Sequence, residues 1–107
     1  MITIDEFAEV EMRVGKVIKA EDVEKSEKLI RLTVNFGEFG ERTIFTGVRS
    51  YGYTAADFAD KQFLFVTNIP YRKMLGEESQ GMILAVDGKD KPLFISADGM
   101  PIGSKVR

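Results

Sequence analysis

The chain contains 107 residues, which is enough for one domain and leaves little room for a second. Hydrophobic residues make up 44% and charged residues 30%, the balance of a globular protein rather than a disordered one. The formal net charge of −2 argues against a protein that coats nucleic acids non-specifically, because such proteins carry a clear basic excess. Cations can still gather on one face of the surface.

The sequence contains neither cysteine nor histidine. This composition excludes a disulfide framework, thiolate metal sites, most zinc sites and an imidazole base. No apolar run approaches the roughly 18 residues that a membrane helix needs. Residues 1–7 carry acids and no basic segment, unlike a signal peptide. We therefore expect a cytoplasmic protein with no cofactor, no metal and no membrane contact.

A short helix and a long bent strand are the first expected elements. Thr3 and Glu6 have the spacing of a capping box, which predicts the helix. From residue 12 the pattern becomes that of a strand, with Gly15 inside it as a bulge or sharp bend requires. A long bent strand contributes to two sides of a small barrel. Four apolar residues are expected on one side of it: Met12, Val14, Ile18 and Ala20.

The clearest alternation of apolar and polar residues follows at residues 30–36, and it predicts a strand with one buried face. Gly37 and Gly40 bracket a hairpin turn. A third strand is expected at residues 42–46, ended by Gly47. The apolar positions of the alternating strand are Ile30, Leu32, Val34 and Phe36.

The second half of the chain predicts further short elements. Thr54 and Asp57 repeat the cap spacing, so one or two helical turns are expected there. Residues 63–66 are apolar on both faces, which indicates a central buried strand. A fifth strand is expected at residues 82–86 and a short sixth at residues 93–95.

Many short strands at intervals of about ten residues, with only capped helical turns between them, indicate a small barrel. We therefore predict an all-β fold: a five-stranded barrel of the oligonucleotide/oligosaccharide-binding (OB) type with short helices. One helix is expected between the third and fourth strands. Residues 1–107 form a single domain without repeats, low-complexity tracts or linkers.

No catalytic centre is visible in the sequence. The 17 acidic residues are scattered over surface turns, and pairs such as Glu77 and Glu78 are interpreted as solvating loops. The pattern offers no general base, nucleophile, metal cluster or phosphate-binding glycine loop. We expect a protein that is not an enzyme and that acts by binding.

Residues 68–82 are the most unusual stretch, because they join two apolar strands yet hold an amide, two adjacent cations, an aromatic ring and a hydroxyl. One interpretation is a solvated loop. In that interpretation Gly76 and Gly81 permit tight turns, while Met74 and Leu75 cover the core.

The second interpretation is a ligand-binding loop at the mouth of the barrel. Arg72 and Lys73 would meet phosphates, and Tyr71 would stack on a base. Two residues would hydrogen-bond a base edge or a sugar, and one would contact an unstacked base, although methionine more often serves in a core. These three are Asn68, Ser79 and Met82.

Three arginines earlier in the chain are further candidates for RNA binding. Arg31 and Arg42 lie on strands, either opposite a buried row or next to a turn. Outward faces of an OB barrel form the oligonucleotide platform, so we expect both residues on it. Arg49, just past Gly47, is expected at the same rim.

Several spaced motifs resemble the tRNA-binding domain family, in the same order and over about residues 4–86. Residues 10–17 resemble the opening of the family, and residues 42–48 a second motif. Residues 68–82 hold the signature asparagine, basic pair, glycine and Ser-x-Gly-Met. Residues 101–107 are similar to the family's ending.

Members of this family occur at the C-terminus of methionyl-tRNA synthetases, as separate subunits of that enzyme and as free-standing proteins, and the chaperone CsaA is related. The resemblance implies an OB barrel whose C-terminal strand extension, within about residues 81–107, builds a homodimer. It implies non-catalytic recognition of tRNA by shape and delivery to a methionyl-tRNA synthetase catalytic domain. By position, Asn68, Ser79 and Met82 match residues linked to tRNA contact, with Arg42, Arg72 and Lys73 as phosphate partners.

Two departures from the family pattern bear on these expectations. Val23-Glu24 stands where the family often has His-Pro, which adds an acid near the face. Gly81-Met82, which the CsaA branch tends to lack, favours the synthetase-like branch. Two alternatives remain open: a CsaA-like peptide-binding export chaperone, and a dimerisation or assembly module without an RNA face.

Overall fold

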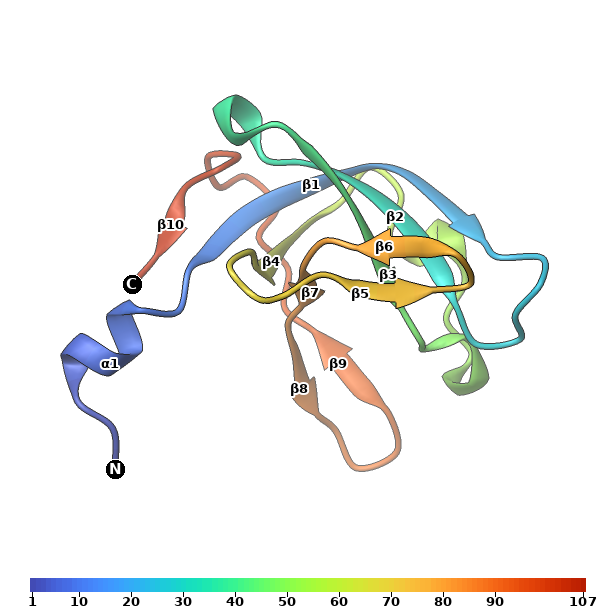
Figure 1. The fold of residues 1–107 in the computed structure, drawn as a ribbon. Coiled ribbons are helices and arrows are strands. Elements are labelled where there is room, and N and C mark those ends of the chain that lie inside the picture. Colours follow the sequence, from blue (N-terminus) through green and yellow to red (C-terminus); the bar gives the residue numbers. More distant parts are fainter.

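A long bent strand, β1 (Met12–Asp22), is the centre of the fold in the computed structural model, which describes residues 1–107 (Figure 1). It pairs antiparallel with β4 (Gln62–Val66) along its first half and with β2 (Ile30–Asn35) along its second. The register of the β1–β2 ladder shifts between Val17 and Lys19. This irregularity lets one strand serve two sides of a barrel.

The barrel contains five strands in the order β3-β2-β1-β4-β7. β3 (Glu41–Thr46) and β7 (Met82–Ile83) lie at the two ends of this order. The N–H of Gln80, just before β7, donates to the carbonyl oxygen of Thr43 at 2.8 Å and so nearly closes the barrel. The prediction of an all-β, OB-type barrel is confirmed.

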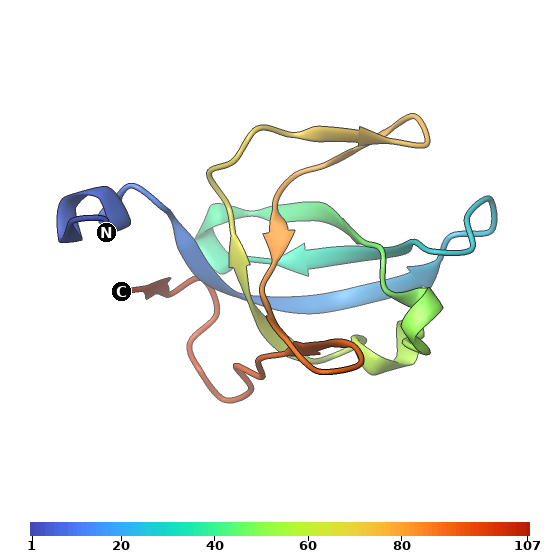
Figure 2. The ribbon, with the colours of Figure 1, turned by 90° about the horizontal axis from the view of Figure 1, so that it is seen from below.

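Two hairpins and a helix extend from this barrel. Figure 2 shows the β5–β6 hairpin on one side of it and the β8–β9 hairpin on the other, with α1 standing apart near the C-terminus. No helix has the length and apolar character that crossing a membrane requires. The elements outside the barrel are α1 (Ile4–Ala8), β5 (Arg72–Met74), β6 (Glu77–Ser79), β8 (Ala85–Asp87), β9 (Pro92–Phe94), β10 (Lys105–Val106) and three 3-10 turns, Gly37–Phe39, Arg49–Tyr51 and Ala55–Asp57.

The core lies inside the barrel and follows from the alternation in β2, whose apolar side chains are buried while their neighbours are half-buried. Aromatic rings fill the centre, and Phe36 meets Phe65 edge to face with centroids 5.4 Å apart. Burying each such side chain fully is worth about 1.5–3 kcal/mol. The core consists of Val17, Ile30, Leu32, Val34, Phe36, Ile44, Val48, Phe58, Phe63, Phe65 and Ile83.

Local sequence signals gave some elements correctly and others wrongly. Both capping boxes are present, at Thr3 and Thr54, but the region between β3 and β4 holds only 3-10 turns and no full helix. Ile18 was expected to face inward with Val14, but it is 40% exposed; Val17 is buried in the core instead, and Ile18 lies at the register shift between Val17 and Lys19. The expected strand at residues 82–86 is two strands, because β7 pairs with β4 and β8 pairs with β9.

Gly15 serves a close approach and not the bulge that the sequence suggested. The β1–β4 pairing is regular at this residue, which lies opposite Phe63. A Cβ atom at position 15 would lie 2.5 Å from Cγ1 of Val34 and 2.7 Å from the ring of Phe36. Glycine is therefore required because the core side chains pack directly on the backbone of β1.

Candidate nucleic-acid interface

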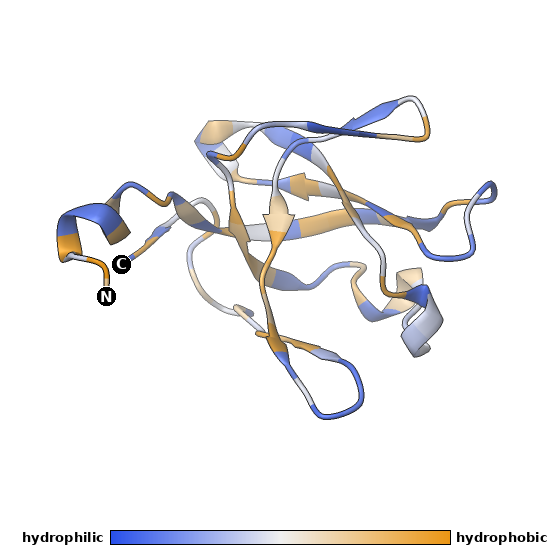
Figure 3. Cartoon of the chain, turned by 60° about the horizontal axis from the view of Figure 1, so that its bottom comes forward, coloured by the Kyte–Doolittle hydropathy of each residue, from blue (hydrophilic) through white to orange (hydrophobic).

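The β5–β6 hairpin carries the basic pair that the sequence singled out. Arg72 lies opposite Ser79 and Lys73 opposite Glu78 in its antiparallel register. Its turn contains Leu75 and Gly76, both with positive φ, which glycine adopts without strain. Figure 3 shows hydrophilic strands in this hairpin and hydrophobic residues near its turn.

Arg72 and Lys73 are exposed, and neither forms an ion pair or a side-chain hydrogen bond. Tyr71, immediately before them, is 47% exposed. These three consecutive residues therefore offer two unneutralised cations and an aromatic ring to the solvent, a combination suited to phosphates and bases.

Arg42 fixes the base of this hairpin to the barrel. Its Nη1 donates to the carbonyl oxygens of Thr67 and Gln80, at 2.5 and 3.1 Å. Those two residues flank the hairpin segment on its two sides. The guanidinium also lies 5.9 Å from the centroid of the Tyr71 ring. In the structure, Arg42, which was predicted as a phosphate partner, holds the two ends of the hairpin segment together.

Ser79 is buried, with 4% of its surface exposed. Its Oγ accepts a hydrogen bond from the backbone N–H of Phe45 at 3.0 Å and donates to the carbonyl oxygen of Gly81 at 3.4 Å. A Cβ atom at Gly81 would lie 2.8 Å from the carbonyl oxygen of Val66. The serine and the glycine of the motif therefore join the hairpin to β3 and β4 by close packing.

Asn68 clamps the N-terminal segment to the end of β4. Its Oδ1 accepts from the N–H of Glu11 at 2.8 Å, and its Nδ2 donates to the carbonyl oxygen of Glu9 at 2.6 Å. Met82 behaves differently. It begins β7 opposite Val66 and is 47% exposed, so its side chain is available to a ligand and is not part of the core.

The Glu11 carboxylate completes this clamp. Its Oε1 accepts hydrogen bonds from Nε of Arg13 and from Oγ1 of Thr67, each at 2.9 Å. The hydrogen bond from Arg13, followed by that from Thr67, lowers the pKa of Glu11 below its ordinary value. The carboxylate is therefore ionised when it holds the segment that leads from α1 into β1.

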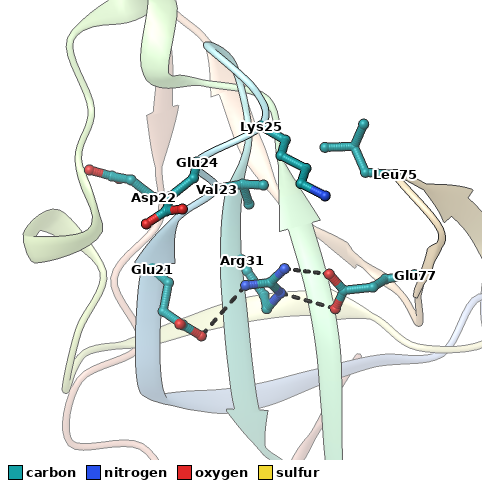
Figure 4. A pocket seen from close by; sticks show the side chains of 8 residues that line it. All are labelled: Glu21, Asp22, Val23, Glu24, Lys25, Arg31, Leu75 and Glu77. Atoms are coloured by element: carbon teal, nitrogen blue, oxygen red, sulfur yellow. Dashed lines mark hydrogen bonds and ion pairs between the residues drawn. The ribbon is translucent and has the colours of Figure 1, made fainter.

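Arg31 is held by two carboxylates (Figure 4). Its Nε and Nη2 donate to Glu77 in a bidentate pair, and its Nη1 lies 3.7 Å from Glu21. The hydrogen bond to Glu77 raises the pKa of Arg31. Both carboxylates line a surface groove of about 350 Å³, which contains four acids and two cations. Glu77, interpreted from the sequence as solvating a loop, in fact connects the hairpin to β2.

Arg49 does not join the hairpin. Its Nη1 donates to the carbonyl oxygens of Val23 and Ser26, and its Nε lies 3.9 Å from Asp22. It supports the loop between β1 and β2. The other predicted site residues, Arg31, Arg42, Asn68, Arg72, Lys73, Ser79 and Met82, lie on the hairpin, at its base or against its tip.

The sequence pattern missed several residues that shape this face. Gln80 is the clearest, because its side-chain Oε1 accepts from the N–H of Thr43 at 2.8 Å and adds to the closure of the barrel. Glu11 and Glu77 also act through partners far away in the chain, so no local signal marks them. No group of three acidic, cysteine or histidine side chains is arranged to hold a metal ion.

Comparison with known proteins decides the family. Residues 12–105 match the family described as "Putative tRNA binding domain". The chain belongs to this tRNA-binding domain family. The resemblance read from residues 10–17 and 68–82 is thereby confirmed. The family is one of binding domains, which agrees with the expectation of a non-catalytic module.

Relatives of this tRNA-binding domain include whole synthetases and chains of its own size. This chain is 41% identical over 106 residues to the methionine–tRNA ligase of Methanocorpusculum labreanum. The match covers 99% of this chain and 15% of that protein. The chain thus spans less than a fifth of the length of the curated relatives that it matches.

Solved structures of similar chains show the same barrel. The MetRS related protein from Pyrococcus horikoshii is 38% identical, with a TM-score of 0.92 over 100% of this chain and 98% of that one. The chaperone CsaA from Bacillus anthracis is 25% identical, with a TM-score of 0.85 over 100% of this chain and 99% of that one.

The buried hydroxyl of Ser79 gives a first prediction. Ser79→Ala leaves the N–H of Phe45 without its acceptor, so the free energy of unfolding should fall by about 1–3 kcal/mol. Ser50→Ala, at an exposed serine, is the control and should leave stability unchanged. Urea unfolding measures both. Unchanged stability combined with lost RNA affinity would show that the hydroxyl contacts RNA directly.

The Glu11 clamp gives a second prediction. Because folding lowers the pKa of Glu11 below 4.5, its contribution to stability is fully present above that pH and is lost as the pH falls through the folded-state pKa. Glu11→Gln should therefore destabilise the domain at about pH 7 and cost less at about pH 3. The same comparison with Glu38→Gln, an exposed acid without a partner, should show no such convergence. A cost for Glu11→Gln that is independent of pH would contradict this role.

Proposed function

We propose that this chain binds tRNA on the face that carries the β5–β6 hairpin, and that it performs no chemistry on the RNA. The observation that supports this most directly is the exposed, unpaired state of Arg72 and Lys73 beside Tyr71. The other predicted arginines, Arg31, Arg42 and Arg49, all make contacts within the chain. Of the cations predicted to bind RNA, Arg72 and Lys73 are therefore the two that can meet phosphates without first breaking internal bonds.

Recognition on this face combines charge with shape. Phosphates of the tRNA backbone meet Arg72 and Lys73, while an unstacked base lies against Tyr71 or Met82. Asn68 and Ser79 contribute by fixing the base of the hairpin. A rigid hairpin that stands over the barrel suits a folded RNA surface better than a flexible single strand, so the preference is for folded tRNA.

We further propose that the chain forms a homodimer through the surface around α1 and the C-terminal residues. Helix α1 has no buried residue, and a five-residue helix is not stable by itself in water. Ile4 and Phe7 of this helix, with Val10 just after it and Val106, line a groove of about 330 Å³. A second copy would cover this groove, which the extension within residues 81–107 also lines through Lys105, Val106 and Arg107.

In this proposal the dimer serves a methionyl-tRNA synthetase in the cytoplasm. It brings tRNA close to the catalytic domain, and two linked RNA faces raise the apparent affinity without new contacts. The support is the match to one segment of methionine–tRNA ligases at 35–44% identity.

A second candidate function is the binding of unfolded polypeptide, as in an export chaperone. The barrel is shared with a protein described as the chaperone CsaA, and the groove beside α1 is lined mainly by apolar residues. Parallel titrations with tRNA and with an unfolded polypeptide separate the two functions. Binding of the polypeptide alone would favour the chaperone.

Removing both hairpin cations tests the RNA face. Arg72→Ala/Lys73→Ala should weaken tRNA binding and flatten the slope of log affinity against log salt by about 0.9 per lost phosphate contact. Fluorescence polarisation with intact tRNA, and with an unstructured RNA of equal length, at several salt concentrations measures the slope and the preference for folded RNA.

The control for this variant removes the same charge elsewhere. Lys61→Ala/Lys89→Ala changes two exposed lysines outside the hairpin and should keep the wild-type slope. Equal slopes in the hairpin variant and the wild type would remove Arg72 and Lys73 from the site.

A charge inside the groove beside α1 tests the dimer. Phe7→Asp should shift the chain from dimer to monomer in sedimentation, because a buried unpaired carboxylate opposes association. Leu75→Asp, at an exposed leucine on the hairpin turn, is the matched control and should remain dimeric. A wild-type chain that sediments as a monomer at high concentration would disprove this interface.

A further inference from the structure

The β5–β6 hairpin carries two adjacent acids beside its cations, and they differ in what they contact. Glu77 accepts two hydrogen bonds from the Arg31 guanidinium, with Nε and Oε1 3.1 Å apart. Glu78, the next residue, forms no ion pair. The Glu77 contact joins residues 46 positions apart in the chain and holds the hairpin against β2.

Arg31 is neutralised more completely than the hairpin cations. Glu21 lies on its other side at 3.7 Å, and the ring of Phe45 lies 5.5 Å from its guanidinium carbon. Its side chain is 25% exposed, so it is accessible from the solvent but not free. Figure 4 shows Arg31 between the two carboxylates, at the wall of the acid-lined groove.

An arginine can bind a phosphate with the same geometry with which Arg31 binds Glu77. An arginine presents a planar fork of N–H groups that binds a carboxylate or a phosphate through two parallel hydrogen bonds. Glu77 occupies that fork. A phosphate that approached Arg31 would have to displace Glu77 and would then face an unpaired carboxylate, besides Glu21, within the groove.

We infer that Glu77 is an affinity-determining residue of the RNA face, an internal competitor that occupies the place of a backbone phosphate on Arg31. This inference rests on the proposed function. RNA then binds through Arg72 and Lys73, while Arg31 remains paired with Glu77. The affinity for RNA and its dependence on salt are therefore lower than if Arg31 also contacted a phosphate.

The test compares tRNA binding by the full chain and its variants over a series of salt concentrations. Glu77→Gln keeps the size of the side chain but removes its charge, which frees Arg31 for a phosphate. It should bind tRNA more tightly than Glu78→Gln, the matched loss of one charge on the same hairpin. Its salt slope should be steeper by about 0.9, so affinity should fall roughly threefold more between about 50 and 200 mM salt.

A second pair of variants tests whether the gain in tRNA affinity depends on Arg31. In an Arg31→Ala background, Glu77→Gln should tighten binding no more than Glu78→Gln does. Urea unfolding of each variant ensures that only folded chains are compared.

Two results overturn the inference while leaving tRNA binding intact. One is a Glu77→Gln chain that binds no more tightly than Glu78→Gln. The other is a specific gain that persists without Arg31. Absence of tRNA binding by the wild type and Glu77→Gln alike contradicts the proposed function itself, and with it this inference.

Discussion

The hydrogen bonds of the Arg42 guanidinium are the contact on which this face depends. Its Nη1 reaches the carbonyl oxygens of Thr67 and Gln80, which bound the segment that forms the β5–β6 hairpin. One charged donor thus satisfies two carbonyl groups where β4 ends and β7 begins, and such charge-assisted bonds are stronger than neutral ones. This contact ties the two ends of the hairpin segment together, beside the hydrogen bonds between Gln80 and Thr43 that nearly close the barrel.

Near Arg42, some polar residues stabilise the face that carries the hairpin, and others are exposed on it. The side chain of Ser79 forms a hydrogen bond with the backbone of Phe45, and that of Asn68 forms hydrogen bonds with the backbone of the N-terminal segment. Arg72, Lys73 and Tyr71 remain exposed. Arg31 and Arg49 lie beside neighbouring acids, whereas Arg72 and Lys73 form no ion pair.

The sequence correctly predicted the secondary-structure elements that depend on local residue patterns. The alternation in residues 30–36 and the capping boxes at Thr3 and Thr54 are local signals, and the structure confirms the elements that they start or form. The inward assignment of Ile18 failed, because Val17 faces the core and Ile18 lies at the register shift between Val17 and Lys19, after which Ala20 packs against the core as expected.

The roles within the site could not be read in the same way. The motif placed Asn68 and Ser79 near RNA, but their partners lie 57 and 34 residues away in the chain. The pairing of Arg31 with Glu77 is likewise a tertiary contact. A signature of residue types indicates which segment matters, whereas burial and hydrogen bonding distinguish the residues that hold the segment from those left free.

A nuclear magnetic resonance titration can locate the RNA face and so test whether the free cations of the hairpin form it. The isotope-labelled chain would be titrated with tRNA while its backbone amide signals are followed. If the hairpin cations bind the RNA, the perturbed signals should concentrate at residues 71–74 and around Met82. Perturbations confined to α1 and the β8–β9 hairpin, with residues 71–74 unchanged, would contradict it.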